Sequence, residues 1–518
     1  MRLTRIIVCL IITVAQAGLS QSVRYYVDAM GGADENDGKS PAAAWRSLEK
    51  INAHSFQPGD EILLKSGSPW TGTLSPKGSG TAGKPIVINK YGGDARPRVD
   101  GGGIIRTATV YLHNQEYWEI NNLEITNDAD APGDRRGVLV SASEAGIVHH
   151  IYLKNLDIHH IKGIVGNDSK AKRTAGIGIE TISDTSVATR FDDILIEGCS
   201  ISFVDNTGLY TDNTMTKARD EYPGTGKWPS RCFSNVRIRK NTIHHIAKNA
   251  MIVRFLDKGV VEHNVCYETA LKTTGNTMFA ASCDGTVFQF NEGSFNRSTG
   301  GDGSMYDADL RSPNTIWQYS YSHDNAHGLF WTCTVQADAN IICRYNISQN
   351  DRGIIFCINY PNTSVYCYNN TVYCGPNTSP TIISERNKGG AGERNYFFYN
   401  NIIYNESPSA QYSFQAKNYK RTIDYNVFYG NHPVSEPKDP NKISSDPLFA
   451  NPGSGGLSLE TLDGYKLKSG SPCIDSGFLI QGHRGSDFWG NPLPIDGKID
   501  RGAFEYQHAT GAKGNGSK

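Results

Sequence analysis

The feature that most constrains this fold is a short β-rich run around an Asn that recurs along the second half of the chain. The anchors are Asn241, Asn264, Asn291, Asn346, Asn370 and Asn401, at steps of 23, 27, 55, 24 and 31 residues. Ser320 takes the missing Asn place inside the long step. A period of about 25 residues without helical spacing predicts a parallel β-solenoid, in which each rung donates an Asn to a stacked turn.

A second periodicity sets the expected register of one sheet. Gly303, Gly328 and Gly353 are each 25 residues apart. Because side chains alternate faces along a strand, and counting each Gly as the first place, the fourth and sixth places of each run are expected inside and the fifth and seventh outside. The inside residues would be Tyr306, Trp331, Phe356, Ala308, Cys333 and Ile358, joined by Phe279 and Val253 from earlier rungs.

Two cysteines fit the same repeat. Cys343 and Cys367 lie 24 residues apart, each three residues before a ladder Asn, so we expect them to stack in neighbouring rungs. The spacing leaves open whether they form a disulfide or remain buried free thiols.

The ends of the chain read differently from the repeat. A basic start, a short apolar run and an Ala-x-Ala site predict a signal peptide over residues 1–17, cleaved after Ala17, and therefore a secreted or periplasmic protein. Ser40 and Pro41 begin a segment in which Trp45, Leu48 and Ile51 recur at helical spacing, which predicts an N-terminal capping helix. We expect the solenoid with its cap over 23–430, a closing segment over 431–506 and a disordered tail over 507–518.

Composition excludes several classes of function. The 518 residues carry 51 Lys and Arg against 52 Asp and Glu, a balance that argues against nucleic-acid binding. An apolar content of 38% is too high for a disordered protein, and after the signal peptide no apolar run is long enough to span a membrane. We expect a monomer.

The motifs at both ends and the rungs between them resemble one known group. The start contains YYVDAMGGADENDGKSPAAAW, PGDEILLKSGSPWTG and GTAGKPIVINKYGG, and the end contains DPLF, YKLKSGSPCIDSG, GNP and DRGAFEY. Over roughly Val23 to Tyr506 the chain resembles secreted bacterial right-handed parallel β-helix proteins of the pectate-lyase-like superfamily. The resemblance implies an all-β fold, but it does not select a reaction, because the superfamily contains hydrolases, lyases, epimerases and adhesins.

The outward fifth and seventh places of the Gly303 rung are Asp307 and Asp309. Residues i and i+2 of one strand project from the same face about 6.6 to 7 Å apart at the backbone, near the lower end of the carboxyl separation in inverting glycosidases. The neighbouring fifth places, Ala280 and Thr332, would leave space over the two carboxylates. The pair is therefore a candidate acid and base for hydrolysis, and a pair of turn-capping or solvated residues is the alternative.

Three charged residues continue this outward line. Glu180, Asp212 and Arg254 fall at the same place of earlier rungs, about 4.8 Å apart per rung. They could bind sugar hydroxyls. Alternatively, as in β-helix polysaccharide lyases, Glu180 and Asp212 would hold Ca²⁺ while Arg254 acts as the base. A plain charge ladder remains a third interpretation.

Further polar residues border the same sheet. Asp302, His327 and Arg352 each precede a Gly anchor and are expected to stack at one edge. His323 stands in the preceding turn and Arg311 follows the acidic pair. All five are candidate substrate-binding residues, and each could instead serve as a turn spacer or ion-pair partner.

The preferred prediction is a glycoside hydrolase that acts on a polysaccharide or oligosaccharide without a cofactor. A Ca²⁺-dependent lyase acting on a uronate-containing glycan and a non-catalytic glycan-binding surface protein are the alternatives. The sequence leaves open whether a metal site exists.

Overall fold

The computed structural model describes residues 22–168, 171–182, 187–213, 223–333, 339–359, 363–386, 393–415, 418–481, 485–494 and 497–508. The expected signal peptide and all but the first two residues of the expected tail lie outside these ranges. No helix in the described ranges is long and apolar enough to cross a membrane.

The described strands form three long sheets in which every paired strand runs parallel to its neighbour. Sheet 1 contains β1 (Arg24–Val27), β2 (Glu61–Lys65), β4 (Ile86–Tyr91), β7 (Trp118–Asn121), β10 (Ile147–Lys154), β13 (Arg190–Glu197), β16 (Phe233–Arg239), β19 (Leu256–Asp257), β20 (Val260–Glu262), β23 (Val287–Gln289), β26 (Ile316–Gln318), β29 (Ala339–Arg344), β32 (Thr363–Tyr368), β35 (Arg394–Tyr399) and β38 (Tyr419–Asp424).

Sheet 2 follows sheet 1 in each turn of the coil. It contains β3 (Pro69–Thr71), β5 (Arg98–Asp100), β8 (Glu124–Asn127), β11 (Asp157–Ile161), β14 (Ser200–Val204), β17 (Thr242–Ile246), β21 (Val265–Tyr267), β24 (Glu292–Ser294), β27 (Tyr321–His323), β30 (Ile347–Gln349), β33 (Thr371–Cys374), β36 (Ile402–Asn405) and β39 (Val427–Gly430).

Sheet 3 completes the turn. It contains β6 (Val110–His113), β9 (Arg136–Ala142), β12 (Ala175–Thr181), β15 (Thr207–Asn213), β18 (Asn249–Arg254), β22 (Met278–Ala281), β25 (Tyr306–Ala308), β28 (Phe330–Thr332), β31 (Ile354–Ile358), β34 (Thr381–Glu385) and β37 (Gln411–Ser413). The short helices are η1 (Pro41–Ala43), α1 (Leu48–Ala53), η2 (Ala171–Arg173), η4 (Trp228–Ser230) and η5 (Leu459–Tyr465).

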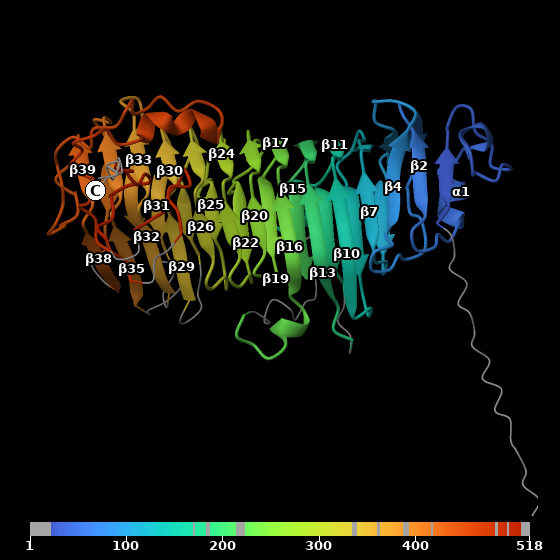
Figure 1. The fold of residues 1–518 in the computed structure, drawn as a ribbon, viewed down its shortest axis with the longest axis horizontal. Helices are drawn as coiled ribbons and strands as arrows, with labels where there is room; N and C mark the ends of the chain where they lie inside the picture. Colours follow the sequence, from blue (N-terminus) through green and yellow to red (C-terminus); the bar gives the residue numbers. More distant parts are fainter. Residues whose placement is uncertain are drawn as a thin grey trace, which may run out of the picture.

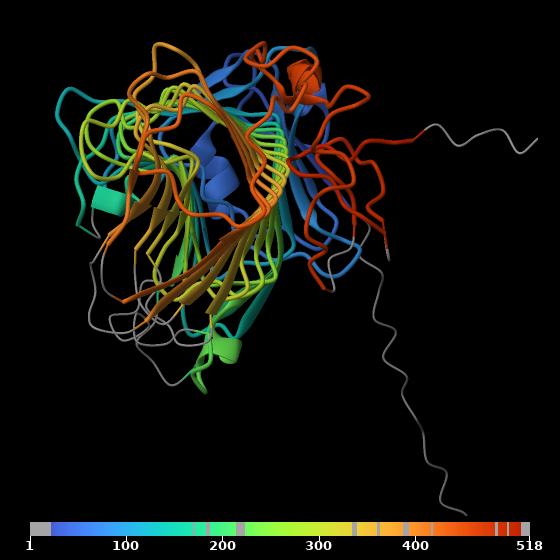
Figure 2. The same cartoon turned by 90° about the vertical axis from the view of Figure 1, so that its left-hand side faces the viewer.

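The chain therefore winds as a coil from one end of an elongated molecule to the other (Figure 1). Each turn passes through one strand of each sheet, so that β10, β11 and β12 make one turn and β13 begins the next. The predicted parallel β-helix is confirmed. Viewed along the coil, the three sheets surround a common interior (Figure 2). Buried apolar side chains fill that interior.

The predicted Asn ladder is also confirmed. The backbone N–H of Asn241 donates to the side-chain oxygen of Asn264 at 3.1 Å, and the same bond repeats from each ladder residue to the next as far as Asn426. Ser320 replaces Asn as predicted, because it accepts from the N–H of Asn291 at 3.1 Å through Oγ. These buried bonds satisfy the backbone where sheet 1 turns into sheet 2.

The register expected for sheet 3 is wrong by one residue at two rungs. Tyr306 aligns with Phe330 and then Phe356, so Phe330 takes the core place expected for Trp331. Phe279 aligns with Asp307 and faces outward. The glycine spacing is a constant 25 residues, but the aligned core residues Tyr306, Phe330 and Phe356 are 24 and then 26 residues apart, because one residue fewer separates Gly328 from its core aromatic.

The two stacked cysteines lie where expected. Cys343 and Cys367 are directly paired between β29 and β32, and both are buried. All cysteines that the structure describes are free thiols, so the thiol alternative holds.

The N-terminal cap is shorter than its sequence pattern. Ser40 caps only the single turn η1, and Trp45 then runs extended, with its N–H bonded to Tyr26 and its carbonyl to Asp28. The helix α1 starts later, behind Ser47, whose hydroxyl accepts from the N–H of Lys50 at 3.1 Å. Its buried Leu48 and Ile51 join the hydrophobic core. The helix itself lies at the end of the coil (Figure 2).

After β39 the chain folds back outside the coil. The segment following Gly430, which includes η5, packs its own apolar cluster against the outer face of sheet 2. In Figure 1 it runs along the upper edge from the last rungs toward β24.

Candidate active site

Two aspartates stand on the outer face of sheet 3. Asp307 is the middle residue of β25 and aligns with Phe279 of the preceding strand and Trp331 of the following strand. Asp309 follows the strand and continues the row of Arg254 and Ala281. Both therefore face outward as predicted, but on two adjacent rows of the sheet.

The prediction that small residues flank Asp307 is wrong. Ala280 and Thr332 align with Ala308 in the core row and do not flank the carboxylate. Because of the one-residue shift, two aromatic side chains, Phe279 and Trp331, flank it instead. Asp307 is consequently only 5% exposed.

This environment makes Asp307 a weak acid. Burial raises its pKa well above the usual 3.8, and the nearby charges of Asp309 and Asp302 raise it further. Asn276 opposes this by donating from Nδ2 to Asp307 Oδ2 at 2.6 Å. The other oxygen, Oδ1, is buried and accepts no hydrogen bond of standard geometry from the described residues.

Asp309 is less buried and closer to positive charge. Burial and Asp302 raise the pKa of its carboxyl, while the N–H of Leu310 and the charges of Arg254 and Lys172 lower it. The protonation of each carboxyl depends on the other. When the pair holds one proton, that proton lies on Asp307, where fewer groups stabilise the anion.

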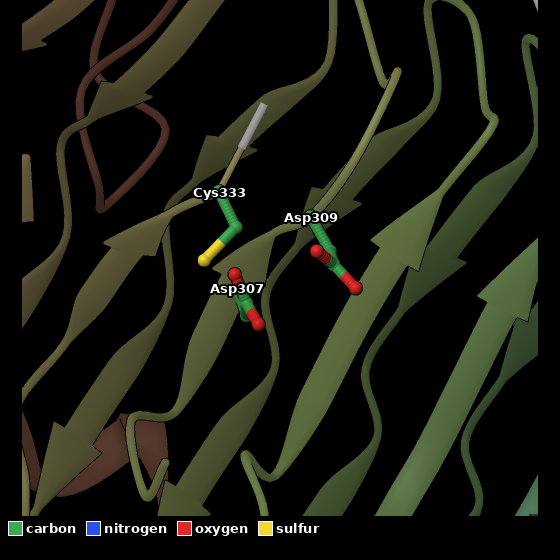
Figure 3. Close-up of side chains that lie close together, drawn as sticks. All are labelled: Asp307, Asp309 and Cys333. Atoms are coloured by element: carbon green, nitrogen blue, oxygen red, sulfur yellow. The ribbon is translucent and has the colours of Figure 1, made fainter. Parts of the chain in front are cut away.

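The third member of the cluster is Cys333, which the sequence analysis placed in the core. One atom each of Asp307, Asp309 and Cys333 lie within 4.8 Å of one another, and the side chains converge on a common point (Figure 3). Burial raises the pKa of the thiol well above its usual value, and both aspartates add to the shift. Trp331 donates from Nε1 to its sulfur at 2.8 Å. Only the correct register of β28 would have revealed this residue.

The chemistry of this donor set does not match Ca²⁺. Calcium takes six to eight oxygen ligands, whereas the cluster offers two carboxylates and a thiol that holds its proton.

The residues proposed for the Ca²⁺ and base roles are engaged with protein partners. Arg254 and Asp212 form an ion pair at 3.1 Å. Glu180 is buried and accepts from Tyr210 Oη at 2.8 Å, and Tyr210 accepts in turn from Arg136 Nε at 3.1 Å. Burial raises the pKa of Glu180, against the opposing charge of Arg136. The line of charged residues exists as predicted and is internally paired.

The predicted edge residues precede successive strands of sheet 3. Asp302, His327 and Arg352 stand before β25, β28 and β31, with Asp302 and Arg352 exposed. His327 donates from Nε2 to the carbonyl of Gly300 at 2.6 Å, and burial lowers the pKa of its ring. Arg311 lies in the turn after β25, where its φ of 63° places it outside the strand.

His323 is not part of this cluster. It ends β27 in sheet 2, is 2% exposed, and hydrogen-bonds Glu292 and Asp324. The expected place in a turn beside sheet 3 is therefore wrong.

The same outer face carries a polar hollow of about 550 Å³ farther along the coil. Its lining comes from β31, β34 and β37 and includes Ser384, Glu385, Arg386 and Gln411. The guanidinium of Arg386 lies 4.7 Å from the centroid of Trp331, which connects the hollow to Asp307. The hollow and the carboxylates thus lie on the same outer face of sheet 3, with Trp331 and Arg386 between them.

The coil of three parallel sheets, the Asn ladder and the capped end define the class. The fold is a right-handed parallel β-helix, as the sequence motifs indicate.

Comparison with known proteins gives relatives of the same architecture. The chain is 28% identical over 601 aligned positions to a lacto-N-biosidase from Bifidobacterium longum subsp. longum, covering 94% of this chain and 36% of that protein. It thus spans about a third of the length of that relative. No family model matches the sequence.

Solved structures show the same fold. The crystal structure of a GH136 lacto-N-biosidase from Eubacterium ramulus superposes with a TM-score of 0.63 at 23% identity, covering 74% of this chain and 68% of that one. XylC in complex with xylose gives 0.53 at 11% identity, covering 94% and 98%.

Proposed function

We propose that this protein is a glycoside hydrolase that uses Asp307 and Asp309 on the outer face of sheet 3. The observation that carries the proposal is the contrast between the two carboxyls. Asp307 is enclosed by aromatic rings and kept protonated, whereas Asp309 lies closer to Arg254 and Lys172. Paired carboxyls whose environments separate their pKa values supply one acid and one anion at the same pH.

In this mechanism Asp307 protonates the oxygen of the departing sugar, and Asp309 acts on the anomeric carbon. The reacting oxygens approach within 4.8 Å, closer to the roughly 5–5.5 Å of retaining glycosidases than to the roughly 6.5–9.5 Å of inverting ones. The separation is shorter than the backbone spacing suggested, because the side chains converge (Figure 3). We therefore assign Asp309 as the nucleophile, after which a water activated by Asp307 releases the sugar.

The substrate is proposed from the relative. The Bifidobacterium protein is a lacto-N-biosidase and aligns with 94% of this chain, so we propose release of lacto-N-biose from an oligosaccharide. The polar hollow lined by Ser384 and Arg386 is available to hold the glycan on the same face. The proposed hydrolysis requires no cofactor.

The lyase alternative lacks a supporting contact. Arg254 would have to break its ion pair with Asp212 in order to act as a base. The carboxylate of Glu180 already accepts a hydrogen bond from Tyr210. The predicted export and monomeric state also remain part of this proposal, and N-terminal sequencing and light scattering of the mature protein test them.

The test is incubation of purified protein with lacto-N-tetraose and with a panel of acidic and neutral glycans. Mass spectrometry should show a disaccharide product with one added water. Products absorbing near 230 nm and lost on chelation would instead indicate elimination, and no product from any glycan would refute catalysis.

A further inference from the structure

A second recessed surface lies on sheet 2, away from the aspartates. A cavity of about 540 Å³ is bounded on one side by the outer face of β21 and β24 and on the other by the edge of the C-terminal segment. This size falls within the roughly 300–1,000 Å³ of small-ligand sites. The residues used below are His263, Phe290, Glu292, Glu460, Asp463 and Trp489, which together with its other lining we call the sheet 2 pocket.

Two aromatic groups form its walls. Phe290 stacks on His263 with ring centroids 5.0 Å apart and on Tyr319 at 5.1 Å, so its ring is held between two others. Trp489 stands on the C-terminal segment and donates from Nε1 to Asp463 Oδ1 at 3.1 Å. Partly exposed ring faces offer an apolar surface to the C–H face of a sugar, while the neighbouring carboxylates accept from its hydroxyls.

The floor contains a carboxylate with a fixed orientation. The side chain of Glu292 is 4% exposed and accepts from His323 Nε2 at 3.1 Å, and His323 Nδ1 bonds Asp324 at 3.0 Å. Burial lowers the pKa of His323, but the hydrogen bonds and charges of Asp324 and Glu292 raise it to about 9. The ring is therefore a cation at neutral pH, and it is hydrogen-bonded to Glu292. Neither residue has a part in the reaction proposed for sheet 3.

Both walls are anchored to the coil by buried groups. Tyr319 donates from Oη to the carbonyl of Ser486 at 2.9 Å, next to the stretch that carries Trp489. Gln349 Oε1 accepts from the N–H of Gly455 at 2.9 Å and from Tyr465 Oη at 2.7 Å, which fixes η5. A cavity whose walls are fixed in advance loses little conformational entropy when a ligand binds.

We propose that the sheet 2 pocket is a second carbohydrate site, which binds a neutral oligosaccharide separately from the site on sheet 3. Neutral sugars are favoured because the exposed carboxylate of Glu460 at the rim would repel a carboxylated or sulfated ligand, whereas Glu292 and Asp463 are paired with His323 and Lys466. A second grip on the same glycan raises the effective concentration of long chains at the protein surface. The inference stands without the proposed hydrolysis.

The test is titration calorimetry on the full chain carrying Asp309→Asn, which prevents turnover, with lacto-N-tetraose and its sialylated form as probes. Adding Trp489→Ala removes one wall and should weaken one class of neutral-sugar binding at least tenfold. The matched control is Tyr429→Ala, which removes a partly exposed aromatic from the same outer face outside the pocket and should leave the isotherm unchanged. Thermal melts confirm that each variant is folded.

A second variant tests the charge argument. Glu460→Lys at the exposed rim should raise the affinity for the sialylated probe relative to the neutral one. With the native Asp309, Trp489→Ala should leave hydrolysis of a small chromogenic lacto-N-bioside unchanged. Identical isotherms for Trp489→Ala and its parent with both probes would overturn the second site, whereas absent hydrolysis with intact binding would overturn only the proposed function.

Discussion

Replacing Asp307 with Asn should make the protein more stable and almost inactive. The wild-type fold holds two carboxyls whose oxygens approach within 4.8 Å, and Asp307 is 5% exposed. At an effective dielectric constant of about 20, two unit charges at this distance repel by about 3 kcal/mol. Burial and this repulsion together raise the pKa of Asp307, so keeping its carboxyl protonated at neutral pH costs free energy that an Asn side chain does not require.

The pH dependence has a defined sign. The folded-state pKa of Asp307 lies above the unfolded value near 3.8, so the unfolded chain releases this proton first as pH rises. The group's favourable contribution is therefore complete below about pH 4, near the unfolded value, and is lost as pH rises through the folded-state pKa. An Asn at this position retains the shape and the bond to Asn276 but does not titrate.

The assay is thermal unfolding of wild type and Asp307→Asn from pH 4 to pH 8. For a chain of this size about 3 kcal/mol corresponds to about 3 °C, and this gain should be present at pH 7 and absent at pH 4. Activity should fall by about 10²–10⁴-fold, as expected for loss of a general acid. The exposed Asp94→Asn is the matched control and should change neither quantity.

The double variant checks the coupling. Asp307→Asn and Asp309→Asn each remove the same repulsion, so their combined gain should be well below the sum of the two. Additive gains, or a less stable Asp307→Asn protein with an unchanged pH profile, would refute the assignment of Asp307 as a buried, protonated acid.

Three further outcomes follow from the same structure. Arg254→Met removes a charge that lowers the pKa of Asp309, so the acidic limb of the kcat/KM profile should move to higher pH; an unmoved limb would contradict the role of Asp309 as the anion. NMR of the first-formed product should show retained anomeric configuration, since inversion would exclude a nucleophilic Asp309. Asn346→Ala breaks buried ladder bonds to Asn370 and Trp317 and should cost about 2–4 kcal/mol in denaturant unfolding, against little change for the exposed Asn451→Ala.

The sequence predicts the coil well because the hydrogen bonds of the ladder require particular side chains at fixed places. A buried Asn at each turn from sheet 1 to sheet 2 must bond the next rung, and Ser320 is recognisable as its substitute by position alone. The cap helix is less predictable, since backbone pairing of Trp45 with β1 overrides the helical spacing around it.

The site is predictable only in part. Asp307 and Asp309 face outward as predicted, but their neighbours do not follow from glycine spacing, which counts residues per turn and not where a turn is shortened. The resulting shift of one residue places Phe330 in the core instead of Trp331, and it brings Cys333 next to the carboxylates. His323 could not be assigned to its sheet for the same reason.

From Asn241 to Asn426 the ladder of side chains acts as a clamp on one corner of the coil. With that corner fixed, the opposite side of a rung can gain or lose a residue while the rungs above and below keep their alignment, as the 24- and 26-residue steps around β28 demonstrate. Each rung of this protein is therefore a separately adjustable module, and single-residue insertions outside the clamped corner offer a route to altered glycan selectivity without rebuilding the scaffold.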